Sequence, residues 1–400
     1  MVKTTKVATL VGLFATSAAF AALPAAAANP EIEALKAELA RLAQRISELE
    51  AGSQPALAPK PVEKQEMAKS SPAVKVKGDF RYRYEFIDEQ NSATRNRNRM
   101  RARVGVSGKV NDAVTAVVQL ASGGDDPVST NQTLDDSFST KDLGIDLAYV
   151  TWQAAENIEV TAGKMKNPLH RAGGNALVWD SDLNPEGVAL RIDRGRVFAN
   201  AAGLFVEERS SSEDSFLLAA QLGFNTEFEN GMDMKAGVGY FIYTNTAGNS
   251  PFYDGSAQGN TVVGGVLVND YKELEVFAEL GMMLGELPVS VFADWLQNTE
   301  VDAFDTAYAI GVKLGKTSAP GSWDFAWIYQ DIEADALIGT FSNSDFSGGG
   351  TDASGQLFTG KYVVAKNWTA GFTYFLNETD KRAGADNDYR RLQADLQFKF

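Results

Sequence analysis

Five arginines occupy alternate positions of one short segment, and together they supply a dense, permanent positive charge. They are Arg95, Arg97, Arg99, Arg101 and Arg103. On a β-strand, alternate side chains point to the same face, so all five guanidinium groups would share one face. Arg81 and Arg83 repeat this spacing on the preceding segment. Such a face either generates a field that acts on solutes or is an ordinary charged lining, partly neutralised by carboxylates such as Asp79 and Glu85.

Residue types that support catalysis or metal binding are scarce. The 400 residues include no cysteine and one histidine, His170. This excludes disulfides, thiolate metal sites, cysteine nucleophiles and multi-histidine metal sites. A hydrolase built on His170 would also need an oriented partner and a nucleophile, and Ser181 is near it only in sequence. We therefore expect no enzyme, no catalytic residue, no cofactor and no metal site.

Acidic residues dominate the charge balance. The formal net charge is −15, which argues against a nucleic acid partner. Two acid pairs, Asp125-Asp126 and Asp135-Asp136, lie in one loop-like region. They have the chemistry to hold calcium together with loop carbonyls, but runs of this kind are more often simply solvated.

The elements that position these residues read as strands. Segments 79–86, 232–240, 323–330 and 392–400 alternate apolar residues with polar or small ones. A period of two predicts strands with one apolar face and one polar or small face. After residue 28, no stretch approaches the ~18 apolar residues of a membrane-spanning helix. Averaging the two faces explains why the mean hydropathy is only −0.20.

Connections between the strands come in two alternating lengths. The short turns are centred at 110–113, 155–157, 193–195, 229–231, 284–286, 317–320 and 365–367. The long loops lie near 87–94, 122–142, 167–185, 208–214, 245–272, 299–303, 334–354 and 379–387. This arrangement predicts sixteen strands. Residues 261–269 also look strand-like, and we assign them to an extension of their loop because one added strand would break the even count.

Short turns at one end and long loops at the other are typical of an outer-membrane barrel. A closed barrel is the only strand structure that satisfies every backbone group in lipid. The alternatives are a soluble sandwich or propeller, which fit strands of ~10 residues and the aromatic final strand less well. An arginine facing lipid at the membrane midplane costs ~2–4 kcal/mol, so the arginine face must point into the lumen.

The segments before the barrel have different compositions. Residues 1–28 combine lysines, an apolar run and an Ala-x-Ala ending, which predicts a cleaved secretory signal. Within 29–51, isoleucines and leucines from Ile32 to Leu49 recur at alternating spacings of three and four, a heptad seam that predicts a self-associating coiled-coil helix. Packing of this helix on its own protein is the alternative. Residues 52–73 form a Pro/Ala-rich linker, and 74–400 form the all-β barrel domain.

Several motifs resemble a known family. They are residues 163–168, 179–187, 366–368 and 374–378, together with the terminal Phe398-Lys399-Phe400. With the sixteen-strand pattern and the coiled coil, they resemble the "putative porin" family of Gram-negative outer-membrane porins. The resemblance implies passive diffusion of small solutes, a homotrimer, and an N-terminal helix in the periplasm. It also implies contact with outer-membrane lipid and lipopolysaccharide, and insertion by the barrel-assembly machinery through Phe400.

In the porin pattern one loop folds inward and narrows the channel, and loop 167–185 is the candidate. It carries Arg171, Asp180 and Asp182. If these acids face the arginines, a transverse field crosses the pore and favours small polar or charged solutes. Alternatively, the acids cap a turn or bind arginine structurally. The main competing function is an envelope anchor acting through the coiled coil; a sheath for an electron-carrying cytochrome and an outer-membrane enzyme are further alternatives.

Overall fold

The fold is a closed ring of antiparallel strands, in a computed structural model that describes Arg41, Gln44 and residues 74–400. The expected signal segment, coiled coil and linker therefore lie outside the described residues, apart from those two positions. The barrel lies in the unit Ser70–Phe400. Among the described residues, no helix has the length and apolar character needed to cross a membrane.

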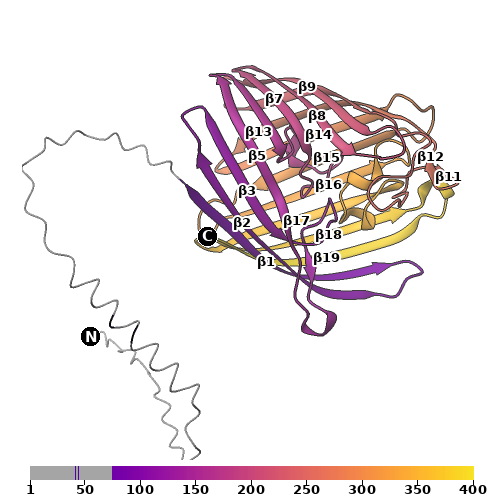
Figure 1. The fold of residues 1–400 in the computed structure, drawn as a ribbon, viewed down its shortest axis with the longest axis horizontal. Coiled ribbons are helices and arrows are strands. Elements are labelled where there is room, and N and C mark those ends of the chain that lie inside the picture. Colours follow the sequence, from indigo (N-terminus) through magenta and orange to yellow (C-terminus); the bar gives the residue numbers. More distant parts are fainter. Residues whose placement is uncertain (1–40, 42–43, 45–73) are drawn as a thin grey trace, which may run out of the picture. The chain divides into compact units, whose positions relative to one another are not determined.

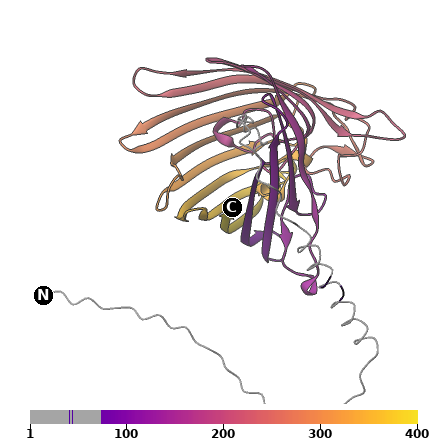
Figure 2. The ribbon, with the colours of Figure 1, turned by 60° about the vertical axis from the view of Figure 1, so that its left-hand side comes forward.

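Sixteen long strands within residues 74–400 form the wall of the barrel. They are β1 (Lys75–Glu89), β2 (Arg95–Lys109), β3 (Val114–Ser122), β5 (Leu143–Ala155), β6 (Ile158–Lys164), β7 (Glu186–Arg194), β8 (Val197–Glu207), β9 (Ser215–Glu227), β10 (Asp233–Tyr243), β13 (Tyr271–Leu284), β14 (Leu287–Asn298), β15 (Thr306–Gly315), β16 (Trp323–Ile332), β17 (Ala353–Ala365), β18 (Trp368–Thr379) and β19 (Asn387–Lys399). The two-residue β4 (Gln132–Thr133) adds a short pairing to β2. Each long strand pairs with its neighbour in the chain (Figures 1 and 2).

Pairing of β1 with β19 closes the ring. The register runs from Asp79 opposite Lys399 to Glu89 opposite Tyr389. Gly78 and Phe400 exchange two backbone hydrogen bonds at the end of this seam, 2.9 and 3.0 Å long. A closed ring leaves no strand edge with unpaired backbone groups, which is the condition for strands to cross lipid. The expected sixteen-strand closed barrel is confirmed.

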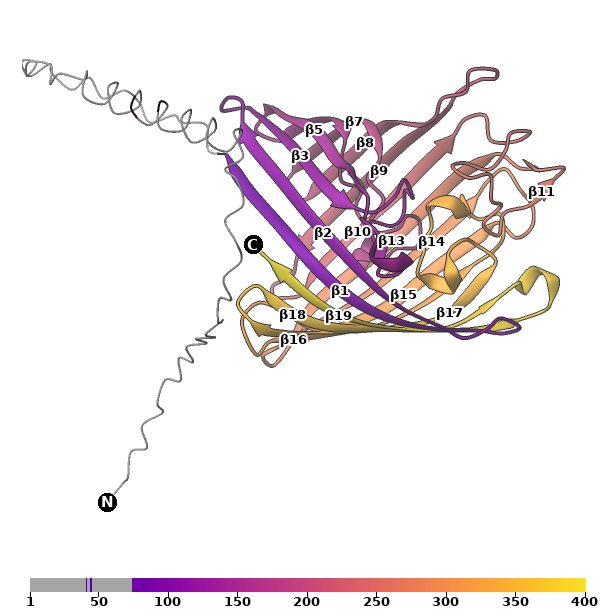
Figure 3. The same ribbon diagram turned by 60° about the horizontal axis from the view of Figure 1, so that its bottom comes forward.

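Residues 261–269 do not join the wall. They contain β11 (Val262–Val263) and β12 (Val266–Leu267), which pair only with each other in a small separate sheet. This hairpin lies at the long-loop end of the barrel, opposite the end where the C-terminus lies (Figure 3). The loop-extension interpretation therefore agrees with the structure.

The two faces of the wall differ as the alternation predicts. Along β9, Leu217 and Gln221 on the inner face are each 3% exposed, whereas Leu218 and Leu222 on the outer face are more than half exposed. The inner face is not polar throughout, however. Part of it is lined by small or apolar residues, such as Ala309 and Ile328, because long loops fold inside and pack against it.

Within residues 74–400, five single-turn 3-10 helices interrupt the loops. They are η1 (Asp136–Phe138), η2 (Ala172–Gly174), η3 (Gly339–Phe341), η4 (Phe346–Gly348) and η5 (Lys381–Ala383). η2 lies in the loop between β6 and β7, and η3 and η4 lie in the loop between β16 and β17. Figure 3 shows these two loops, in magenta and orange, within the outline of the barrel. The interior core of the barrel is therefore built partly from loop residues, among them Leu177, Trp179 and Phe346.

Candidate functional site

The arginine face lies on three neighbouring strands, β2, β1 and β19. Their register places Arg83 between Arg99 and Asp395, and Arg81 between Arg101 and Gln397. Tyr82 and Tyr84, of the opposite parity, are exposed on the outer face. The arginines Arg81, Arg83, Arg97, Arg99, Arg101 and Arg103 are partly or fully buried. Arg95, at the long-loop end of β2, is exposed instead.

Most of these arginines are paired with carboxylates. Arg83 Nε lies 2.7 Å from Asp395, and Arg103 Nε lies 2.8 Å from Asp79. Asp79 also forms an ion pair with Arg101, at 3.2 Å. Glu85, fully buried, is contacted by Arg97 and by Arg391 of β19, the latter at 2.7 Å. Carboxylates on neighbouring strands thus neutralise much of the positive charge of the arginine face.

The β6–β7 loop, residues 165–185, contacts the arginine face through one of its predicted acids. Asp182 lies 3.3 Å from Arg101 Nη1. Asp180, 5% exposed, makes different contacts. Its carboxylate accepts hydrogen bonds from the Asp182 and Ser344 backbone N–H groups, at 2.7 and 2.8 Å, and from Ser344 Oγ at 2.9 Å. One acid therefore binds an arginine, whereas the other caps a turn and joins two loops.

The same loop is held on the far side of the barrel by acids of β13 and β14. The backbone N–H of Gly173 donates to Glu279 at 2.6 Å, and Asn175 Nδ2 donates to Asp294 at 2.8 Å. Residues 170–182 therefore reach from the acidic strands to the arginine face. Gly173 has φ +56°, and a methyl group added to it would collide with the ring of Phe292, so the crossing needs glycine there.

His170 and Arg171 also lie in this inward loop. The His170 ring packs on Phe277 and Phe198, with centroid distances of 5.1 and 5.8 Å, and its Nε2 lies 3.4 Å from Glu279. No hydrogen bond joins His170 to Ser181 among the described residues. Arg171 is partly buried, and burial lowers its pKa while Asp180 partly offsets that effect.

The sequence reasoning missed a second inward loop, residues 333–352 between β16 and β17. Its Asp345 lies between two arginines of the wall, 3.1 Å from Arg83 and 2.6 Å from Arg391. The loop also anchors apolar residues, since Leu337 and Phe346 are each 1% exposed. Its run of Ala, Leu, Ile and Phe between polar residues was the available signal, because a solvent-exposed loop has no need of these side chains.

Asp180 and Asp345, one in each inward loop, have pKa values shifted in opposite directions. Burial raises the pKa of Asp180 to about 7, and the nearby Asp182 and Asp345 add to the rise. Burial would also raise the pKa of Asp345, but the charges of Arg391 and Arg83 outweigh it and hold the pKa below its ordinary value. Asp345 is therefore a permanent anion at neutral pH, whereas Asp180 titrates near neutrality.

An acidic wall stands well away from the arginines. Glu273 and Glu275 on β13 and Asp294 on β14 are all at most 3% exposed. In the ring, β14 is separated from β1 by five strands, β15 to β19, so this wall faces the arginine side. The sequence signal was present, because Glu273, Glu275 and Glu279 share one parity.

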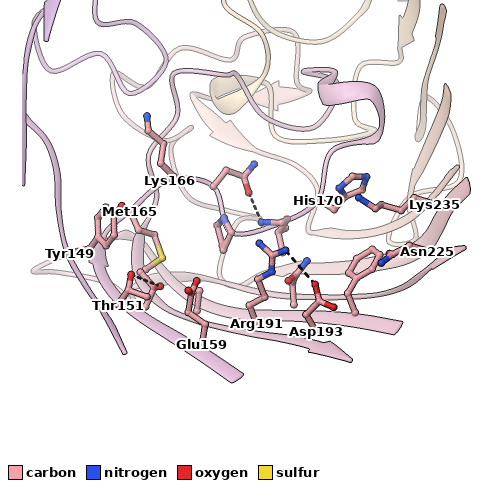
Figure 4. A pocket seen from close by; sticks show the side chains of 17 residues that line it. Tyr149, Thr151, Glu159, Met165, Lys166, His170, Arg191, Asp193, Asn225 and Lys235 are labelled. Atoms are coloured by element: carbon pink, nitrogen blue, oxygen red, sulfur yellow. Dashed lines mark hydrogen bonds and ion pairs between the residues drawn. The ribbon is translucent and has the colours of Figure 1, made fainter. Parts of the chain in front are cut away.

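An open vestibule of about 330 Å³ lies on the inner wall near the short-turn end. Figure 4 shows Glu159, Arg191 and Asp193 on the strands, with His170 and Lys235 to one side. Arg191 and Asp193 lie 3.8 Å apart and remain largely exposed. The vestibule is hydrophilic and is bordered by the inward β6–β7 loop.

The acid pairs of loop 123–142 show no metal-binding arrangement. Asp125 accepts a hydrogen bond from the Tyr253 hydroxyl at 3.0 Å, and Asp135 pairs with Lys141 at 3.4 Å. Within residues 74–400, no group of three or more His, Cys, Asp or Glu side chains is arranged to hold a metal ion.

Comparison with protein families decides the assignment. The model of the family described as "Putative porin" matches residues 57–263 and 269–400. The chain belongs to the putative porin family. Porins are water-filled barrels of the outer membrane, so family and fold together make the protein an outer-membrane channel. No curated protein matches the sequence.

The comparison with solved structures finds matches at low sequence identity. OprB of Pseudomonas putida, solved at high pH, is 9% identical, with a TM-score of 0.57 over 82% of this chain and 94% of that one. A loop-deletion mutant of OmpT, an outer membrane protein of Vibrio cholerae, is 14% identical, with a TM-score of 0.47 over 82% and 100%. A mutant porin of Rhodopseudomonas blastica is 10% identical, with a TM-score of 0.47 over 82% and 100%.

Proposed function

We propose that this porin admits small polar or charged solutes by passive diffusion, through a constriction between the arginine face and its inward loops. The supporting observation is the path of the β6–β7 loop, which reaches from Glu279 and Asp294 to Arg101. Charges of opposite sign on facing walls produce a transverse field, which orders water and disfavours apolar solutes.

Arginines set the sign of the weak selectivity in this proposal. Charged groups in a wet lumen act over a screening length of ~8 Å at physiological salt, so the local wall outweighs the distant net charge. Since most of the arginines are paired, we expect a mild anion preference. We also propose that Arg171, Asp180 and Asp182 shape the constriction, Asp182 by direct contact with the wall and Asp180 by holding the two inward loops together.

Assembly completes the proposal. Short turns face the periplasm in barrels of this class, so β1 enters the wall from that side and the N-terminal helix lies in the periplasm. Outer-membrane lipid and lipopolysaccharide surround the barrel, and Phe400, paired with Gly78, is the contact for the barrel-assembly machinery. The functional unit is a homotrimer, associated in part through residues 29–51.

The experiment is a planar-bilayer recording on purified protein, with the reversal potential measured in a salt gradient. We expect stable open steps and a small anion preference. Changing Arg97, Arg99 and Arg101 together to Gln should move the reversal potential towards cations without preventing assembly. A silent barrel whose deletion detaches the envelope would instead support the anchor.

A further inference from the structure

Each rung of the arginine face has a different charge balance. A rung is defined here as one residue of β1 together with the residues directly opposite it on β2 and on β19. The Arg83 rung includes Asp395, and the rung of Asp79 includes Arg103. The Arg81 rung contains Arg101 and Gln397 but no carboxylate.

Arg81 is consequently an arginine of this face that lies inside the lumen and has no acidic partner among residues 74–400, whereas Arg95, which also has none, is exposed at the long-loop end. Among residues 74–400 it forms no ion pair; its Nη2 donates instead to the neutral Asn131 side chain, at 2.5 Å. Its rung neighbour Arg101 is already shared by Asp79 and Asp182. Arg81 therefore has no carboxylate in direct contact, and Asp395 and Asp182 act on its charge only from a longer distance.

Hydrogen-bond donors are in excess at the same place. The buried Nε groups of Arg81, Arg99 and Arg101 have no acceptor among the described residues. Arg101 is 6% exposed, whereas Arg81 keeps part of its surface open to the lumen. A guanidinium presents its donors in a rigid fork that matches two oxygens of one anion. An oxyanion would match these donors in both charge and geometry.

We propose that Arg81, with Arg99, Arg101 and Asn131 around it, forms a transit site for small oxyanions and is the main determinant of anion preference. This inference rests on the proposed channel function. The ligand chemistry is a carboxylate or a phosphate, because both offer paired oxygens to one guanidinium, whereas chloride offers a single point of contact. The arginines outside this group, Arg83, Arg97 and Arg103, serve chiefly to neutralise structural carboxylates.

The test compares two single substitutions of equal charge. Arg81→Gln removes the unpaired guanidinium, and Arg103→Gln removes one already held by Asp79. Chloride current through the purified channel is titrated with inorganic phosphate and, separately, with succinate. Heat-modifiable migration of the folded barrel on a gel verifies that each variant is assembled.

We expect phosphate or succinate to reduce the chloride current of the unmodified channel. Arg81→Gln should raise the half-blocking concentration by about tenfold, the worth of one charge-assisted hydrogen bond, and Arg103→Gln by less than about twofold. Arg81→Lys, which keeps the charge and loses the fork, should fall between them. The more effective of the two anions identifies the ligand as phosphate-like or carboxylate-like.

Two outcomes would overturn the site. One is equal sensitivity of the Arg81→Gln and Arg103→Gln channels, which would mean that the wall acts as a uniform field. The other is a conducting unmodified channel that neither anion affects. Failure of the channel function itself would look different, because the unmodified protein would then show no open steps at all.

Discussion

Asp345 illustrates how a single carboxylate holds a loop inside the barrel. Its oxygens contact Arg83 and Arg391, which belong to the strands that close the ring. The pKa of Asp345 is lowered in the folded barrel. Its charge therefore stabilises the docked loop at any pH above the ordinary pKa of an aspartate, and this stabilisation is lost only as the pH falls through the lowered pKa. This clamp should therefore be insensitive to pH between 5 and 8.

Asp345→Asn should loosen the inward loop without opening the ring. The substitution keeps the shape and removes the charge, so two charge-assisted hydrogen bonds weaken and the docking free energy falls by about 1–3 kcal/mol. We expect larger current fluctuations and a higher mean conductance in bilayers. Asp388→Asn, on an exposed carboxylate that pairs only with Arg390 among residues 74–400, is the matched control and should leave the current unchanged.

Asp180 should make the contact between the two inward loops pH-dependent. Its pKa is about 7 when docked and 3.8 ordinarily, so the docked state binds more protons and loses stability as pH rises from about 4 to 7. Asp182, Asp345 and Arg171 are the charged groups around it. We expect current fluctuations to increase between pH 5 and pH 7.5.

Asp180→Asn supplies the control for that dependence. The amide carries no charge at any pH in the range, so fluctuations in this variant should be the same at pH 5 and pH 7.5. A variant that keeps the full pH response would show that another group titrates and that Asp180 is only a loop link.

At the scale of elements, the inward loops occupy space that a simple barrel would leave to water. Phe292 of β14 lies against Gly173 of one loop, and His170 packs on Phe277 of β13. The β16–β17 loop joins the first loop through the Asp180–Ser344 contact. In the proposed channel the two loops therefore form the constriction together, and we expect each to limit the current.

Removing the tip of the second loop tests this. Replacing residues 339–348 by a short glycine linker deletes η3, η4, Asp345 and Phe346 while sparing Asp335, which binds Thr261 and Tyr271. We expect the single-channel conductance to rise by about twofold or more, because a wider pore conducts more. Deleting the exposed residues 210–212 should leave it unchanged, and equal conductance for both deletions would contradict the two-loop constriction.

The sequence predicted the elements better than their contacts. Alternation and loop lengths were enough for sixteen strands, because a half-buried strand must show a period of two and because turns at the two ends differ in length. The same parity placed the arginines on one face of the wall. The register that pairs Asp79 with Arg103, or leaves Arg81 without an acid, depends on which residues meet across strands, and alternation carries no such information.

The inward β16–β17 loop was missed for a related reason. A long loop at one end of a barrel has the same signature whether it projects outward or folds in. Only its apolar content distinguishes the cases, and that content becomes meaningful once the apolar inner faces of β15 and β16 are known to lie beneath it. The residue type and position of Asp180 made it a candidate, but its main partners, Ser344 and Asp182, follow from that fold.

At the scale of the whole molecule, oligomeric state remains a prediction from the heptad seam. Changing Leu39 and Leu42 to Asp places charges in that seam and should weaken N-terminal association. Cross-linking in membranes should then yield fewer trimers, while the barrel still migrates as folded. If cross-linking of the unmodified protein yields only monomers, the apolar seam of residues 32–49 must pack on another partner.

The pairing of β1 with β19, which closes the barrel, also determines the order of the folding steps. Arg83 and Asp395, which meet across this pairing, are 312 residues apart in the chain. Bringing such distant segments together carries a large loop-closure entropy, and folding dominated by distant pairings is slow. Until β19 arrives, both edges of the growing sheet stay open to pairing with other chains. During biogenesis the exported polypeptide must therefore be protected by chaperones until the barrel closes. Closure is a single late event rather than a gradual one.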